Sequence, residues 1–224
     1  MDNKFRECPN DGCILDFYKG VYEAVYVVLH PFYYSTIIDF NEINDKSWPS
    51  DTELLKHCNT ILWKDILEIA KFNNLSEIDI GLRTSIGGLR KDMEAPLLAE
   101  KIRKLFFDQK IISPESTGLI SPFVFKDIFS SIHRLAINQM WLIDEFCLEI
   151  PKVRDIETIV NNLSIERGSY YSDNNTLLVT THWDSHCSFV CGSKSLLDQF
   201  IALSQLEGFF CSNKTQVYWG IYDL

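Results

Sequence analysis

The chain has 224 residues, of which 46% are hydrophobic, 23% are charged and 13% are aromatic. This composition is typical of a folded globular protein with a core of ordinary size and argues against a disordered chain. The formal net charge of -10 disfavours nucleic acid and anionic membrane surfaces, so we predict neither as a partner. A basic protein partner fits the sign of the charge.

The start of the chain gives no sign of export. Residues 1–7 are mostly polar and lack the apolar stretch of a secretory signal. The most apolar early segment, Ala24 to Leu29, is far shorter than the roughly 20 residues that cross a bilayer. Seven cysteines, an odd number, are scattered along the sequence, and without export most should be reduced thiols. We therefore predict a soluble cytoplasmic protein.

The first part of the chain, to about residue 44, has the pattern of strands and loops. Residues 21–29 are rich in β-branched and aromatic residues, which favour a strand, and His30-Pro31 ends it.

Helices are predicted in the middle of the chain. Ser50 and Glu53 have the spacing of a capping box, which indicates a helix start just after Pro49. Ser121 followed by Pro122 is typical of an N-cap and a first helical residue. Periodicity and start signals place the other helices at residues 63–72, from Ser76 with Asp79 to the break at Gly87-Gly88, and at about 92–109. Residues 140–150 fit neither period, so helix and strand both remain open there.

The last third predicts strands with a packed helix. A helix is expected at 155–163, strands at 169–171 and 176–181 around the turn 173–175, a strand at 188–191, a helix from Ser193 stopped by Gly208, and a closing hairpin of 209–211 with 215–219. This order predicts an α+β fold, with a mostly helical middle and a C-terminal antiparallel or mixed sheet packed by a helix. We expect one domain over residues 1–224, with a subdomain boundary near 150 as the alternative.

Aromatic residues are concentrated in this predicted sheet. They are expected to form its core rather than a stacking platform for bases. They are Trp183, Phe189, Phe209, Phe210, Tyr218 and Trp219.

A dense group of side chains suited to chemistry lies at residues 182–191. His182, His186, Cys187 and Cys191 are the nitrogen and sulfur donors that zinc accepts. In an extended strand, residues four apart lie roughly 13 Å apart, so a turn would have to fold the two histidines together. A second hypothesis makes Cys187 a nucleophile, with His182 or His186 as its base and Asp184 as the orienting group. Ordinary strand and turn residues are the third interpretation, and the one we expect.

A second group combines paired glycines with cations. Gly87 and Gly88, flanked by Arg83, Arg90 and Lys91, could cradle an anion with backbone N–H groups. Neither a Walker loop nor a dinucleotide fingerprint is present. The alternative, which we favour, is a helix C-cap followed by a turn with solvated cations.

Three segments resemble an uncharacterised family. Leu29-His-Pro-Phe32, Thr84-Ser-Ile-Gly-Gly-Leu-Arg90 and Leu206-Glu-Gly-Phe-Phe-Cys211 look like those of a bacterial family known only as a domain of unknown function. The resemblance covers nearly the whole chain and implies a bacterial, cytoplasmic protein. It implies no catalytic or binding residues.

The sequence contains no complete catalytic or cofactor motif. We therefore predict a non-enzymatic protein that binds another protein, as immunity or regulatory proteins do, with the acidic charge steering a basic partner. One alternative is a metal- or thiol-dependent small-molecule enzyme using residues 182–187, and another is a phosphate or anion ligand at Gly87-Gly88. No cofactor is expected, zinc being the one metal that residues 182–191 suggest.

Overall fold

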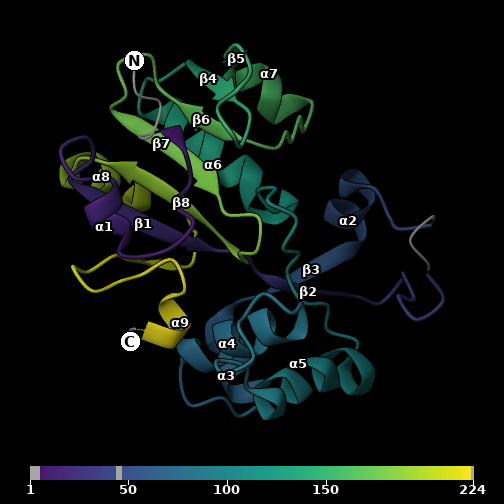
Figure 1. Ribbon diagram of the computed structural model, residues 1–224. Helices are drawn as coiled ribbons and strands as arrows, with labels where there is room; N and C mark the ends of the chain where they lie inside the picture. The colour runs from purple at the N-terminus through teal and green to yellow at the C-terminus, as the bar shows by residue number, and fades with distance from the viewer. Residues whose placement is uncertain (1–5, 44–46, 223–224) are drawn as a thin grey trace.

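The computed structural model describes residues 6–43 and 47–222 (Figure 1). The charged residues at the very start of the chain, and the predicted end of the N-terminal strand region at Asn44, lie outside these ranges. Within them, seven strands form one antiparallel sheet in the order β5-β4-β6-β7-β8-β1-β9, and β2 pairs with β3 separately. The strands are β1 Ala24–Leu29, β2 Phe32–Ser35, β3 Cys58–Ile61, β4 Gln139–Ile143, β5 Lys152–Asp155, β6 Ser169–Tyr171, β7 Leu177–Thr181, β8 Cys187–Gly192 and β9 Gly208–Phe210.

Helices pack on both faces of the large sheet. They are α1 Ile14–Phe17, α2 Asp51–His57, α3 Trp63–Ile69, α4 Leu75–Ser85, α5 Pro96–Gln109, α6 Pro122–Arg134, α7 Ile156–Asn161, α8 Lys194–Leu203 and α9 Trp219–Tyr222. Side chains of α6, α7 and α8 share one core with the sheet, and those of α1, α3, α4 and α9 share the other. In Figure 1, α3, α4 and α5 form a helical group below the sheet. Every helix in the described ranges is too short or too polar to traverse a bilayer.

Strand β1 shows why the sheet is buried on both sides. Val25, Val27 and Leu29 enter the core with α3 and α4, whereas Tyr26 and Val28 enter the core with α6 and α8. Alternate residues of a strand point to opposite faces, so a strand covered on both faces must be apolar throughout. This burial accounts for the nearly unbroken apolar run that predicted the strand.

The α+β class is confirmed, but the sheet is not confined to the C-terminal part of the chain. Strand β1 lies between β8 and β9, so this N-terminal strand is hydrogen-bonded on both edges to strands from the last part of the sequence. The unassigned stretch 140–150 contributes β4 and then a loop. The sheet therefore joins segments from the beginning, the middle and the end of the sequence.

The predicted closing hairpin is wrong. Residues 208–210 pair with β1 rather than with 215–219, which supply only a bridge between Cys13 and Gln216 and the start of α9. Gly208 does not stop a helix, because α8 ends at Leu203. A Cβ at Gly208 would lie 2.0 Å from the carbonyl oxygen of Val27, so the close approach of the two strands requires glycine there.

Helix starts were predicted well where a side chain caps its own helix. Ser50 and Glu53 form the expected capping box at α2, and Ser193 accepts from the backbone of Leu196 at α8. The start assigned to Ser76 is wrong by two residues. Asn74 caps α4 by accepting from the backbone N–H of Glu77 at 3.0 Å, and this interaction fixes the first turn.

Candidate functional site

Arg83 joins two segments that the sequence singled out separately. Its side chain is fully buried on α4, where Nε lies 2.9 Å from the carboxylate of Asp79, one turn earlier. Its Nη1 donates to the carbonyl of Asp184 and its Nη2 to that of Val217, each at 3.1 Å. The ring of Tyr218 covers the guanidinium at 4.8 Å. Arg83 therefore fastens α4 to the β7–β8 turn and to the C-terminal segment.

The β7–β8 turn places His182 beside this arginine. The N–H of Asp184 donates to Nδ1 of His182 at 3.2 Å, and the N–H of Ser185 donates to its carbonyl at 3.0 Å. Burial, reinforced by the charge of Arg83, lowers the pKa of His182 to about 4. The ring is therefore neutral at neutral pH, with Nδ1 as acceptor and the proton on Nε2.

His186 and Cys187 are buried and make other contacts. Nδ1 of His186 donates to the carbonyl of Pro114 at 2.9 Å, and Sγ of Cys187 lies 3.0 Å from Oγ of Ser185. Burial raises the pKa of Cys187 to about 11, so its thiol stays protonated at neutral pH. A protonated thiol is a poor nucleophile, and this geometry gives the thiol hypothesis no support.

The zinc hypothesis also gains no support from the geometry. Cys191 is completely buried, and burial raises its pKa. All seven cysteines lie in the described ranges, and all are free. Across those ranges, no three His, Cys, Asp or Glu side chains are grouped closely enough to hold a metal ion. His182, His186 and Cys187 are close together in the sequence, but their side chains do not converge on a point where a metal ion could bind.

His182 does line a cavity of about 550 Å³, here called the His182 pocket. Three of its residues are charged: Glu145 pairs with Arg167 at 3.6 Å, and Glu7 adds a second carboxylate. The complete lining is Glu7, Cys8, Asn10, Glu145, Phe146, Arg167, Thr181, His182, Trp183 and Tyr218. A pocket of this size, with aromatic walls and a few polar groups, is typical of binding sites.

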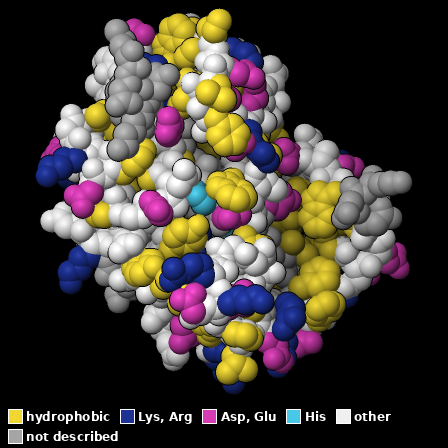
Figure 2. Space-filling view, viewed as in Figure 1, with side chains coloured by type: hydrophobic (Ala, Val, Ile, Leu, Met, Phe, Trp, Pro, Cys, Tyr) yellow, Lys and Arg dark blue, Asp and Glu magenta, His cyan; other side chains and the backbone are white. Residues whose placement is uncertain are grey.

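Four large apolar side chains are exposed in the wall of this pocket and on the loop between β4 and β5. Phe146 is 68% exposed, Leu148 84%, Ile150 87% and Trp183 59%. Phe146 and Trp183 line the His182 pocket, and Ile150 lines a neighbouring hollow that also contains Arg167. We call these four residues the apolar rim. Figure 2 shows hydrophobic side chains gathered in the upper part of this face, interleaved with charged ones.

The exposed position of Trp183 contradicts the prediction that it lies in the sheet core, and the other three residues of the apolar rim were not predicted. Trp183 was expected in the sheet core but lies in the turn after β7, whereas Phe189 and Trp219 are buried as expected. Phe146, Leu148 and Ile150 were missed. Periodicity alone could not have found them, because the same unassigned stretch also contains Met140, Leu142 and Ile143, which are buried.

The paired glycines end a helix. The N–H of Gly88 donates to the carbonyl of Arg83, and that of Gly87 to Thr84, which is the Schellman pattern with Gly87 at φ +70°. Both N–H groups are therefore used inside the protein and cannot cradle an anion, whereas Gly88 and Arg90 line a surface cavity of about 550 Å³. Arg90 and Lys91 are exposed, and Arg90 pairs with Asp92 at 3.1 Å.

Comparison with known proteins gives one match. A family model described as a protein of unknown function (DUF2711) matches residues 10–221. No curated protein and no solved structure matches the chain. The resemblance to a family known only as a domain of unknown function is thereby confirmed.

Proposed function

Because the chain belongs to the DUF2711 family, whose description names no activity, its own surface must indicate its role, and we propose that it binds a basic protein partner. The observation that carries the proposal is the apolar rim. The proposal includes a non-catalytic, regulatory or immunity-like role in the bacterial cytoplasm, in keeping with the sequence prediction.

The apolar rim has the composition of a protein-binding surface. Single exposed apolar residues are ordinary, but large ones grouped on one loop, with two exposed aromatic rings in the wall of one pocket, are typical of an interaction site. Phe146 and Trp183 are of the aromatic type that contributes most to binding energy in protein interfaces. Covering an exposed apolar side chain removes it from water, which is the dominant favourable term in most protein–protein association. Leu148 and Ile150, almost fully exposed, would gain the most from being covered.

The net charge of the chain favours a basic partner. Of the carboxylates near the rim, Glu145 pairs with Arg167 and Glu149 with Lys152, and Glu7 lies in the adjoining pocket. The whole chain carries a formal charge of -10, which attracts a basic protein over distances of about 10 Å at moderate salt. Charge of this kind speeds association and excludes acidic competitors.

The test is capture of a partner by the rim itself. Tagged protein, its Leu148→Asp variant and a Leu97→Asp control are used to capture proteins from a lysate of the source cells. Leu97 is 79% exposed on α5, so the control makes the same change outside the rim. We expect a basic protein to be retained by the parent and the control, to be lost with Leu148→Asp, and to dissociate as salt is raised.

Two results would contradict this function. One is equal retention of the partner by both variants, and the other is a strictly monomeric protein that retains nothing. Thermal unfolding of the two variants should match the parent, because both substitutions lie at exposed positions.

The alternative is a zinc- or thiol-dependent small-molecule enzyme, and His182 in its pocket is the observation that favours it. Elemental analysis of the purified protein separates this alternative from partner binding. Stoichiometric zinc that is lost in His182→Ala would support the enzyme, and a metal-free preparation would remove its zinc form.

A further inference from the structure

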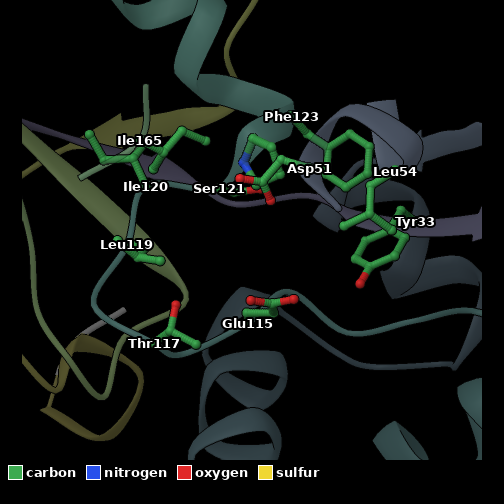
Figure 3. A pocket seen from close by; sticks show the side chains of 11 residues that line it. Tyr33, Asp51, Leu54, Glu115, Thr117, Leu119, Ile120, Ser121, Phe123 and Ile165 are labelled. Atoms are coloured by element: carbon green, nitrogen blue, oxygen red, sulfur yellow. The ribbon is translucent and has the colours of Figure 1, made fainter. Parts of the chain in front are cut away.

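A second and much smaller cavity lies beside α2 (Figure 3). Its volume is about 30 Å³, which is more than the roughly 10–15 Å³ that one water molecule needs. Tyr33 comes from β2, Asp51 from the first turn of α2, and Glu115 from the segment before α6. The other lining residues are Leu54, Thr117, Leu119, Ile120, Ser121, Pro122, Phe123 and Ile165.

The hydroxyl of Tyr33 faces this cavity without a partner. The residue is 2% exposed, and its hydroxyl makes no hydrogen bond with any described residue. The ring is held in place by Phe123 at 4.9 Å and Phe40 at 5.9 Å, so the hydroxyl cannot turn to water. Figure 3 shows it pointing into the cavity. A buried unpaired hydroxyl costs about 1–3 kcal/mol, so it indicates a missing polar ligand.

Two carboxyl groups line the cavity, and no cationic side chain of the described residues lines it with them. In Figure 3, Asp51 and Glu115 face the cavity from opposite sides. Both residues are exposed on their outer side, and partial desolvation on the cavity side raises the pKa of both, with the charge of Asp51 raising that of Glu115 further. None of the described residues that line the cavity is Lys or Arg. The cavity therefore offers hydrogen-bond acceptors and negative charge that suit a positive ligand.

We propose that this cavity binds the head of a primary alkylammonium group. Such a head has three N–H donors, which match the carboxylates of Asp51 and Glu115 and the hydroxyl oxygen of Tyr33. The walls beside these acceptors are apolar and suit the methylene stem. A divalent metal would need about six oxygen ligands and would gain nothing from apolar walls.

The ligand is either a free small amine or a lysine side chain of a bound protein, and the inference does not depend on the apolar rim. The cavity nevertheless adjoins the His182 pocket. Arg167, which lines that pocket, donates to the carbonyl of Thr117, which lines this cavity, at 2.6 Å.

The experiment titrates the purified protein with n-butylammonium chloride and follows its tryptophan fluorescence, to which Trp48, whose indole donates to Glu115, contributes. Calorimetry provides a second readout. We expect saturable binding that weakens at least tenfold in Asp51→Asn, in Glu115→Gln and in Tyr33→Phe. Asp127→Asn makes the same charge change at an exposed site on α6 and should bind as the parent does.

Two further probes define the ligand. Tetramethylammonium has the charge without N–H donors, and its binding as tightly as n-butylammonium would overturn the proposal. Unaltered binding in Tyr33→Phe and Glu115→Gln would overturn it as well. Tighter binding of Nα-acetyl-lysinamide than of n-butylammonium supports a protein lysine as the ligand, and the reverse order supports a small amine. Leu148→Asp should leave both affinities unchanged, which separates this site from the rim.

Discussion

Arg83 and Asp184 are joined by a hydrogen bond of 3.1 Å from Nη1 to a backbone carbonyl, although 101 positions separate them. The sequence had assigned the two residues to different candidate sites. In the structure Arg83 orders the turn that carries His182 and Trp183, and through that turn it shapes the His182 pocket. Its contribution is structural and electrostatic.

We predict that Arg83→Met lowers the free energy of unfolding by about 3–5 kcal/mol. The reason is that the buried carboxylate of Asp79 would keep its desolvation cost and lose its ion pair. Urea unfolding followed by circular dichroism measures the change. Arg90→Met is the control: Arg90 is 71% exposed, and its pair with Asp92 should contribute about 0–1 kcal/mol. Equal effects of the two substitutions would refute the structural role of Arg83.

We predict that the protein loses stability as the pH falls below about 6.5. Burial lowers the pKa of His30 and His186 to about 3 and that of His182 to about 4, whereas an unfolded His titrates near 6.5. Between these pH values the three histidines are protonated in the unfolded chain and remain neutral in the folded chain. Stability is therefore full above the unfolded pKa and falls by about 1.4 kcal/mol per pH unit for each His.

The measurement is urea unfolding at a series of pH values from neutral to about 5. His30→Gln should reduce the slope by the contribution of one His, because glutamine can still bond Ser188 and has no proton to gain. His133→Gln, at an exposed position on α6, is the matched control. A stability that stays constant or rises on acidification would show that these rings are not held neutral by the fold.

We predict that Cys187 and Cys191 react more slowly with iodoacetamide at neutral pH than Cys13. Cys187 is 2% exposed and Cys191 is completely buried, and burial raises the pKa of both, so little thiolate forms. The partly exposed Cys13 should react sooner. Peptide mass mapping over time gives the order. Rapid, selective labelling of Cys187 would instead revive the thiol-enzyme alternative.

The predictions that held rested on interactions between near neighbours. The capping box of Ser50 and Glu53 spans three residues, and the turn between β6 and β7 places Asn175 at φ +53°. Such patterns can be read from sequence because the partners are adjacent in the chain.

The predictions that failed depended on distant partners. Residues 215–219 have the composition of a strand, but β1 pairs with β9, so no hairpin forms. Trp183 continues an apolar strand pattern, yet the turn before β8 turns it outward. Tyr33, Asp51 and Glu115 come from three separate segments and share no local spacing. Only the folded chain brings them to one cavity.

The central position of β1 has a consequence for synthesis. Its hydrogen-bonding partners lie at residues 187–192 and 208–210, so almost the entire chain must be translated before either edge of β1 is paired. At 5–20 residues per second, the interval is on the order of 10–30 s. During that time an apolar segment with both edges open can pair with other nascent chains. The yield of folded protein in a cell therefore depends on what shields residues 24–29 while the ribosome finishes the chain.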